Sequence, residues 1–406
     1  MIESVIFFFS GSGMVMLFIL FMRINVVGSK SKLVKHRSKE PGFVDLLIYA
    51  SVVDEGVIVG KDGSLMAAWA YQGVDSNSST EAERDQVSLQ INHALSRMGS
   101  GWMIHIDAVR KPAPGYSAKD DSHFPDPVSA AIDEERREFF ERVGTLYESN
   151  YVITATYLPP LLAQQKFVEL MFDDEGVPVD SKTRTIALLN HFKRECANIE
   201  SHLSSVFRMK RLKGKTITKE DNSSVNYDAF LRWIQFCISG LDHPVILPKN
   251  PIYLDALLSG QEFWGGVVPK IGQNFIQVVS IEGFPLASSP GLINSLADLP
   301  CLYRWSTRFI FMDTHEAVGH LEKFSKKWKQ KIRSFFDQVF NSHSSNVDQN
   351  AINMVSDAQA AIAETNSGEV AQGYYTSVVV LMSESRGDLE ASARQVAKAI
   401  NHLGFA

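Results

Sequence analysis

Short alternations of apolar and polar positions open the region that follows residue 43. Residues 57–59 are apolar and lead into an Asp-Gly turn at 61–64, and residues 65–71 return, which is typical of a tight hairpin. Apolar residues then recur at helical spacing over 87–98, and an alternating strand is predicted over 102–109.

A polar and charged helix is predicted over 132–147, and the alternation returns in a strand over 151–157. These elements give the order ββαβαβ. We therefore predict a first α+β unit over residues 43–160.

The rest of the chain divides into a helical middle, residues 161–272, and a second α+β unit, residues 273–406. The middle shows helical periodicity over 183–212 and 227–238, followed by a loop rich in Pro and Gly. In the second unit, strands are predicted over 275–281, 302–312 and 374–382, with helices between them and a last helix over 388–402. The predicted fold class is α+β, with two split-βαβ-like units around a helical middle segment.

The first residues form a long apolar stretch. Residues 5–22 contain no charge, and eighteen helical residues span about 27 Å, close to the thickness of a bilayer core. The stretch predicts a transmembrane anchor over residues 1–22. A cleaved signal peptide is less favoured because Glu3 precedes the apolar run and no small-residue cleavage site follows. A buried core helix is the remaining alternative.

A basic juxtamembrane linker, residues 23–42, is predicted after the anchor. One-sided positive charge places the body of the protein in the cytoplasm. The same side chains are candidates for contact with anionic lipid, or serve only as a topology signal. They are Arg23, Lys30, Lys32, Lys35, Arg37 and Lys39.

Composition narrows the possible functions. The chain has 406 residues and a net charge of −6, so any binding to nucleic acid would need a local patch. It is 45% hydrophobic and 21% charged, as expected of a folded protein. The three cysteines form no C-x-x-C pair and no disulfide framework.

No complete catalytic, cofactor or metal motif is found. Gly214-Lys215-Thr216 resembles the end of a P-loop, but Met209 stands where the first glycine belongs. His315 and His320 are one residue too far apart for the H-E-x-x-H zinc motif. We predict no catalytic residue, no cofactor-binding residue and no metal ligand in this chain.

Two basic segments leave alternatives open. The first, residues 208–219, is interpreted as the end of a helix and its loop, either a solvated cap or a patch for phosphate groups. The second is a helix over 320–340 with one apolar stripe and a lysine-rich remainder. Its stripe either faces the core or binds a partner or membrane surface.

Several blocks of the sequence resemble the TrbE-type conjugal-transfer ATPases of type IV secretion (the CagE/TrbE/VirB family), in their N-terminal portion. Six of them fall in order between residues 43 and 160, and two more follow. They are 43–50 (FVDLLIYA), 61–65 (KDGSL), 99–108 (GSGWMIHIDA), 124–127 (FPDP), 132–137 (IDEERR), 157–160 (YLPP), 279–285 (VSIEGFP) and 301–306 (CLYRWS).

The resemblance implies a role in bacterial conjugation. Full-length members hydrolyse ATP, with Mg, in a C-terminal RecA-like domain whose Walker A and B motifs this chain lacks. The implied partners are inner-membrane and cytoplasmic components of the secretion complex, the membrane, further copies of the chain and, only indirectly, nucleic acid. Together with the apolar stretch and the basic linker, the resemblance predicts localisation to the bacterial inner membrane, with a single span and a cytoplasmic body. Candidate docking residues in the first unit are Trp102, His105 and Arg110.

Three functions are in competition. The favoured one is a membrane-docking and assembly domain of a conjugal-transfer ATPase, without the motor and without activity of its own. The second is a stand-alone, membrane-tethered assembly factor of a secretion complex. The third is an unrecognised hydrolase.

Overall fold

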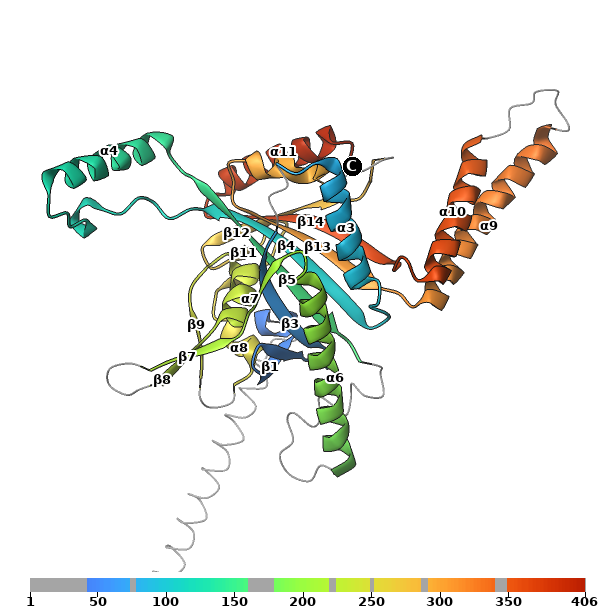
Figure 1. Ribbon diagram of the computed structural model, residues 1–406, viewed down its shortest axis with the longest axis horizontal. Coiled ribbons are helices and arrows are strands. Elements are labelled where there is room, and N and C mark those ends of the chain that lie inside the picture. Colours follow the sequence, from blue (N-terminus) through green and yellow to red (C-terminus); the bar gives the residue numbers. More distant parts are fainter. Residues whose placement is uncertain are drawn as a thin grey trace, which may run out of the picture. The chain divides into compact units, whose positions relative to one another are not determined.

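An eleven-stranded sheet, antiparallel throughout, organises residues 48–406 in the computed structural model (Figure 1). The structure describes residues 42–73, 78–159, 179–218, 224–248, 252–285, 291–339 and 349–405. Residues 1–47 make up a separate unit, in which the short helix α2 (Phe43–Leu46) is described. The α+β class predicted from the sequence is confirmed.

The first strands have a split-βαβ connectivity. β1 (Tyr49–Asp54) and β2 (Val57–Gly60) precede β3 (Leu65–Gln72), and the predicted hairpin between β2 and β3 is confirmed. α3 (Glu81–Leu95) then leads to β4 (Trp102–Pro112), and α4 (Pro127–Val143) leads to β5 (Tyr147–Tyr157). β5 pairs antiparallel with both β3 and β4, so it lies between two strands that run parallel to each other.

The last strands repeat this connectivity. β12 (Asn274–Ile281) leads through the 3₁₀ helix η2 (Leu292–Asp298) to β13 (Tyr303–Phe311). After α9 (Thr314–Val339) and α10 (Gln349–Ser367), β14 (Gly373–Ser383) inserts between β12 and β13, and α11 (Arg386–His402) follows. The short strands β10 (Phe263–Trp264) and β11 (Lys270–Ile271) continue the sheet beyond β12.

A single ladder joins the two groups of strands. β4 pairs with β13 from Tyr303 opposite Arg110 to Ile310 opposite Met103. The two split-βαβ arrangements therefore share one continuous sheet instead of forming separately packed layers.

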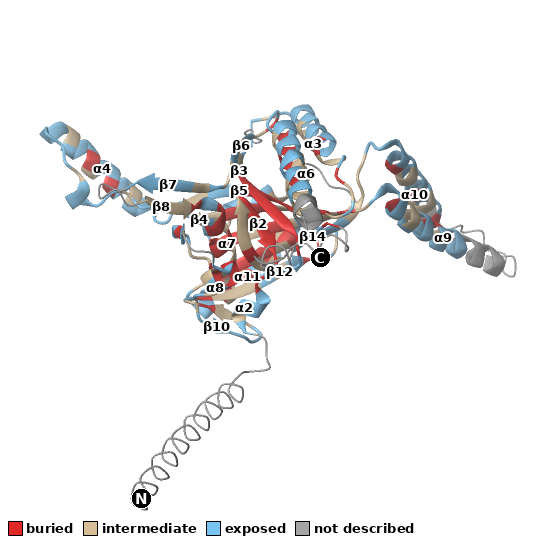
Figure 2. Cartoon of the chain, turned by 90° about the horizontal axis from the view of Figure 1, so that it is seen from below, coloured by how far each residue is buried: buried red, intermediate tan, exposed pale blue. Residues whose placement is uncertain are grey.

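Two clusters of buried side chains hold helices on the sheet, and buried strands fill the centre of Figure 2. The first lies between β3, β4, β5 and the helices α3 and α6 (Val179–Leu203), and it includes Trp69 and Phe192. The second packs α11 against β12 and β14 through Leu389 and Val396. α6 and α11 each pack an apolar face on the sheet, as expected of amphipathic helices.

The middle of the chain is partly helical and partly extended. β6 (Arg208–Arg211) pairs with β3 and joins the large sheet, whereas β7 (Gly214–Thr218), β8 (Ser224–Asp228) and β9 (Val245–Leu247) form a small separate one. α7 (Ala229–Ser239) and α8 (Leu254–Leu258) complete this region. Asp228 caps α7 by accepting hydrogen bonds from the amides of Phe230 and Leu231, at 2.8 and 2.9 Å.

Three sequence-based boundaries need correction. The helix predicted over 183–212 ends at Leu203, and the basic segment 208–219 contributes the strands β6 and β7. The helix predicted over 132–147 runs from Pro127 to Val143, and the strand predicted over 151–157 already begins at Tyr147. The helix predicted from residue 227 begins only after β8 ends at Asp228.

The predicted transmembrane anchor, residues 1–22, lies outside the described residues, as do the six basic residues of the linker. Among the helices that the structure describes, none combines the length and the apolar composition needed to cross a bilayer. The longest, α9, carries five lysines between residues 323 and 331, and charge is costly inside hydrocarbon. The predicted transmembrane helix and the predicted single-pass inner-membrane localisation are therefore not supported, and neither is the membrane as a partner.

Candidate functional site

Trp102 lies in the core rather than on the surface. Only 7% of its surface is exposed, and its ring stacks on Phe192 and tilts against Tyr157, with centroid distances of 5.7 and 4.8 Å. The packing under α3 and α6 explains this side chain directly. Nothing observed tests its predicted docking role.

His105 is on the opposite face of the sheet from Trp102, because successive side chains of a strand alternate. It is paired in register with Thr154 on β5 and Arg308 on β13. Burial, together with the charges of Arg304 and Arg308, lowers the pKa of His105 to about 4. The imidazole is therefore neutral near pH 7.

Arg110 lies on the same face of the sheet as Trp102, because the two residues are an even number of positions apart in β4. Its Nε donates a hydrogen bond of 2.8 Å to the carbonyl oxygen of Leu299, and its guanidinium lies 4.8 Å from the centre of the Tyr147 ring. The three predicted docking residues thus occupy two faces and both ends of β4. The structure does not bring them together in one site.

A buried ion pair lies on the face of His105. The Arg304 Nε atom is 3.6 Å from Asp107 Oδ1, and Asp107 is 4% exposed. Burial raises the pKa of Asp107, against the opposing effects of Arg304 and the Ser306 hydroxyl. Burial disfavours the charged form of Arg304, but Cys237 and Asp107 outweigh it and raise the pKa of the guanidinium.

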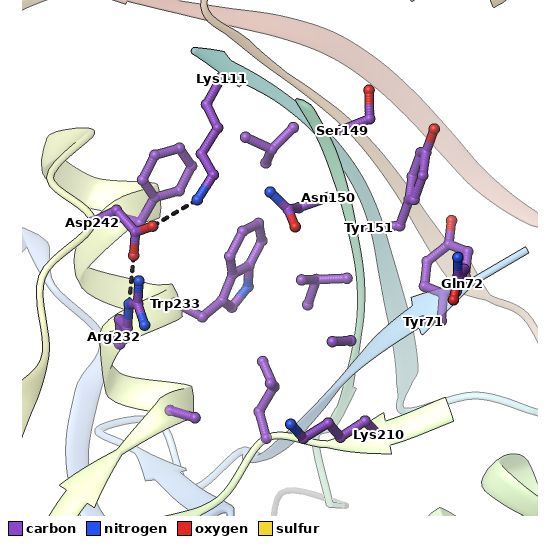
Figure 3. A pocket seen from close by; sticks show the side chains of 16 residues that line it. Tyr71, Gln72, Lys111, Ser149, Asn150, Tyr151, Lys210, Arg232, Trp233 and Asp242 are labelled. Atoms are coloured by element: carbon purple, nitrogen blue, oxygen red, sulfur yellow. Dashed lines mark hydrogen bonds and ion pairs between the residues drawn. The ribbon is translucent and has the colours of Figure 1, made fainter. Parts of the chain in front are cut away.

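The candidate functional site is an open groove of about 650 Å³ on this same face of the sheet. Its floor and walls come from β3, β4, β5, β6 and α7, as Figure 3 shows. Apolar contact surface is supplied by Val109, Val152, Trp233 and Phe236. We call it the α7 groove.

Charged side chains stand at the rims of the α7 groove. Lys111 Nζ lies 2.8 Å from Asp242 Oδ2, and Arg232 Nε lies 2.5 Å from Asp242 Oδ1. Burial alone would raise the pKa of Asp242, but hydrogen bonds from Arg232 and Lys111 hold it below its usual range. Lys210 stands on the opposite side of the groove (Figure 3).

This lining is suited to binding rather than to covalent chemistry. Lys111, Lys210 and Arg232 outnumber Asp242, and asparagine, serine and aromatic side chains complete the polar surface. In the described ranges, no group of three His, Cys, Asp or Glu side chains could hold a metal ion. An anionic segment with apolar side chains fits such a surface best.

Sequence reasoning found only part of this groove. Lys210 belongs to the basic segment that the sequence singled out, but Lys111, Arg232, Trp233 and Asp242 were missed. Lys111 and Asp242 are 131 residues apart and meet only in the folded chain. The alternation of β4, continued past Val109, is the one signal that could have placed Lys111 on this face.

The motifs weighed for catalysis occupy ordinary elements. Gly214-Lys215-Thr216 lies within β7, where Lys215 pairs with Tyr227 of β8. His315 and His320 are in α9, and His320 Nε2 lies 3.9 Å from Glu316 Oε1. Neither arrangement forms the loop or the two-histidine face that the motif would require.

Two family models match this chain. The N-terminal domain of the type IV secretion system ATPase VirB4/TrbE matches residues 56–165. The CagE, TrbE, VirB family, a component of the type IV transporter system, matches residues 215–406. Both matches point to the same class of protein, components of type IV secretion systems, and the first model is that of an ATPase.

Individual relatives narrow the class to TrbE. The "Conjugal transfer protein TrbE" of Rhizobium radiobacter is 42% identical over 372 residues, covering 91% of this chain and 45% of the relative. In Sinorhizobium fredii, the "Probable conjugal transfer protein TrbE" is divided into two chains. The first is 49% identical over 125 residues, 31% of this chain and 84% of the relative. The second is 40% identical over 215 residues, 53% of this chain and 32% of the relative.

The chain belongs to the TrbE-type family of type IV secretion system ATPases, as the sequence resemblance predicted. It spans less than half the length of the Rhizobium protein.

Proposed function

We propose that this chain is the assembly module of a conjugal-transfer ATPase, through which the ATPase engages other components of the secretion complex. The observation that carries the proposal is the α7 groove, an open, cation-rimmed and partly apolar surface. Its lining offers binding contacts without an evident catalytic constellation. Membership of the family supports a role in assembly, since type IV secretion ATPases work within a larger complex.

The groove favours an acidic, extended segment as its ligand. Two of its cations, Lys111 and Arg232, already share Asp242, and Lys111 also lies 3.2 Å from Glu148 Oε1. Lys210 is exposed on the far rim and carries the charge most accessible to a ligand. An acidic side chain at the far rim would therefore pair with Lys210.

The edge of β6 gives a backbone rationale for an extended ligand. β6 pairs with β3 along one side, and within the described strands no partner occupies its other side. An extended peptide can add to such an edge through main-chain hydrogen bonds, while pockets beside it select side chains. Lys210 and Leu212 connect this edge to the groove.

Reversing the charge of Lys210 should weaken assembly. We expect Lys210→Glu to lower co-purification of this chain with other conjugal-transfer components about tenfold, because a like-charge contact with the acidic ligand replaces an attractive one. The measurement is quantitative pull-down from cells that express the whole transfer system. Trp233→Ala should have a similar effect by removing apolar contact area.

Lys215→Glu is the matched control. Lys215 is also exposed and belongs to the same basic segment, but it lies on β7 and is absent from the groove lining. Equal losses for Lys210→Glu and Lys215→Glu would mean that overall charge, and not the groove, controls association.

A second prediction concerns ATP. We expect the chain to bind no ATP with micromolar affinity, because the backbone of Gly214-Lys215-Thr216 is extended in β7 and cannot wrap phosphates as a P-loop does. Titration calorimetry with Mg-ATP should show no saturable heat, and Lys215→Ala should change nothing. A saturable signal that Lys215→Ala removes would contradict this.

A further inference from the structure

The helix α9 contains a short repeat in its amino-acid sequence. Within residues 320–331, a residue with a flat ring (histidine, phenylalanine or tryptophan) is followed three positions later by a lysine, and this pair recurs every four residues. The repeat occurs three times without a break. The pairs are His320 with Lys323, Phe324 with Lys327, and Trp328 with Lys331.

The helix turns this repeat into two parallel rows of side chains. Residues four apart lie one above the other on a helix, and residues three apart are neighbours on its surface. One row therefore holds the rings and the other holds the lysines, and successive members of each row are about 6 Å apart along the axis. Two contacts show the rows. The ring centroids of Phe324 and Trp328 are 6.1 Å apart, and Lys331 Nζ lies 4.3 Å from the centre of the Trp328 ring.

Both rows are accessible from solvent, although α10 lies along α9 (Figure 1). Phe324 is 47% exposed, His320 and the three lysines of the repeat are exposed, and Trp328 is half-buried. The row of rings also continues onto the sheet. The ring of His320 is 6.2 Å from that of Tyr374, which is exposed near the start of β14.

No acidic side chain of α9 interrupts the two rows. Glu322 lies to one side of them, where its Oε2 atom is 3.5 Å from Lys326 Nζ. Glu316 precedes the first pair and lies 3.9 Å from His320 Nε2. The three lysines of the repeat form no ion pair with any residue that the structure describes, so their charge is available to a ligand. Such a local patch is what a chain of net negative charge needs in order to bind a polyanion.

From these two rows we infer that α9 is a binding surface for single-stranded nucleic acid, with bases against the rings and phosphates against the lysines. Flat rings stack on any base, and lysines neutralise phosphates whatever the sequence. A flexible single strand can spread its bases to match rings about 6 Å apart. The bases of a duplex are fixed about 3.4 Å apart and paired with each other, so a duplex would contact the lysines alone. The inference does not depend on the α7 groove, which lies on other elements.

The salt dependence of binding tests the row of lysines. The full chain is titrated onto a fluorescent oligothymidylate of about 20 nucleotides, and binding is followed by anisotropy. With three phosphates neutralised, the logarithm of the affinity should fall against the logarithm of salt concentration with a slope of about −2, and Lys327→Gln should reduce this slope by about 0.7. Absence of saturable binding at low salt would overturn the inference.

Lys326→Gln is the matched control for Lys327→Gln. Lys326 is the preceding residue and is equally classed as exposed, but it lies outside both rows and beside Glu322. The same loss of charge should therefore leave the salt slope unchanged. Equal reductions in the two variants would mean that the diffuse charge of α9, and not the row, attracts the oligonucleotide.

Substitutions of Phe324 separate stacking from general apolar contact. Phe324→Leu should weaken binding of the oligothymidylate about tenfold, because it keeps an apolar side chain but removes the ring on which a base stacks. Phe324→Tyr keeps the ring and should bind as the unsubstituted chain does. Circular dichroism should show the same helix content in both variants, since the side chain is 47% exposed. Unchanged affinity of Phe324→Leu would contradict the stacking of bases.

Competing ligands identify the class of molecule that α9 recognises. Oligothymidylate and oligouridylate should both bind, and the tighter of the two assigns the surface to DNA or to RNA. A hairpin duplex of the same length should bind about tenfold more weakly, because its paired bases do not reach the rings. Polyglutamate or phosphatidylglycerol vesicles that displace the oligonucleotide equally well, at the same concentration of charge, would show that α9 recognises an acidic protein segment or a lipid surface instead.

Discussion

Trp102→Ala should lower the free energy of unfolding by about 3–5 kcal/mol, the usual loss for a large aromatic side chain truncated in a core. Trp102 is 7% exposed and contacts Phe192 and Tyr157, so the substitution leaves a cavity between β4 and α6. Urea unfolding followed by tryptophan fluorescence and circular dichroism measures the change. If this variant also docks less well, we expect the loss of docking to be proportional to the loss of folded protein.

Trp264→Ala is the matched control for that measurement. Trp264 is 60% exposed on the short strand β10, so its truncation should change stability by less than about 0.5 kcal/mol. A Trp102→Ala variant that is as stable as the Trp264→Ala variant, and yet fails to co-purify with secretion components, would restore Trp102 as a contact residue.

Asp107→Ala should lower the free energy of unfolding by about 3 kcal/mol, because it leaves the buried Nε atom of Arg304 without the carboxylate beside it. Arg304 extends from β13 beside Asp107 on β4, so the loss acts on the ladder that joins the two groups of strands. Chemical denaturation should show a lower midpoint with little change in slope.

The double variant Asp107→Val with Arg304→Met distinguishes the cost of an unpaired charge from the cost of lost packing. Apolar replacement of both partners of a buried ion pair is often neutral or stabilising. We expect the double variant to recover most of the stability lost in Asp107→Ala. A double variant that is less stable than Asp107→Ala would show that the pair itself stabilises the sheet.

The sequence predicts the strands with strong apolar alternation and the turn that joins β2 to β3. It misses β6 and β7 because their side chains are mostly basic or polar, with Met209 and Ile217 as the only large apolar residues. These strands form because β3 and β8 offer paired edges, which is tertiary information. The start of α4 at Pro127 could have been predicted from the sequence, since Asp126 is a helix-capping residue and proline is favoured in the first turn.

The candidate site is less accessible to sequence reasoning than the fold. Trp102, His105 and Arg110 are close in sequence, but the alternation of β4 separates His105 from the other two. The α7 groove, by contrast, gathers side chains from five elements, and its ion pairs join residues that are distant in sequence. The local sequence pattern cannot indicate which distant residues will line the same groove.

The ladder between β4 and β13 also constrains how the protein is made. β4 is complete when the ribosome has added Pro112, whereas β13 begins only at Tyr303. At about 5–20 residues per second, translation of the intervening chain takes roughly 10–40 s. Throughout this interval the β4 edge has no native neighbour and is open to pairing with other nascent chains. The yield of correctly folded protein should therefore depend on how well this edge is shielded during synthesis.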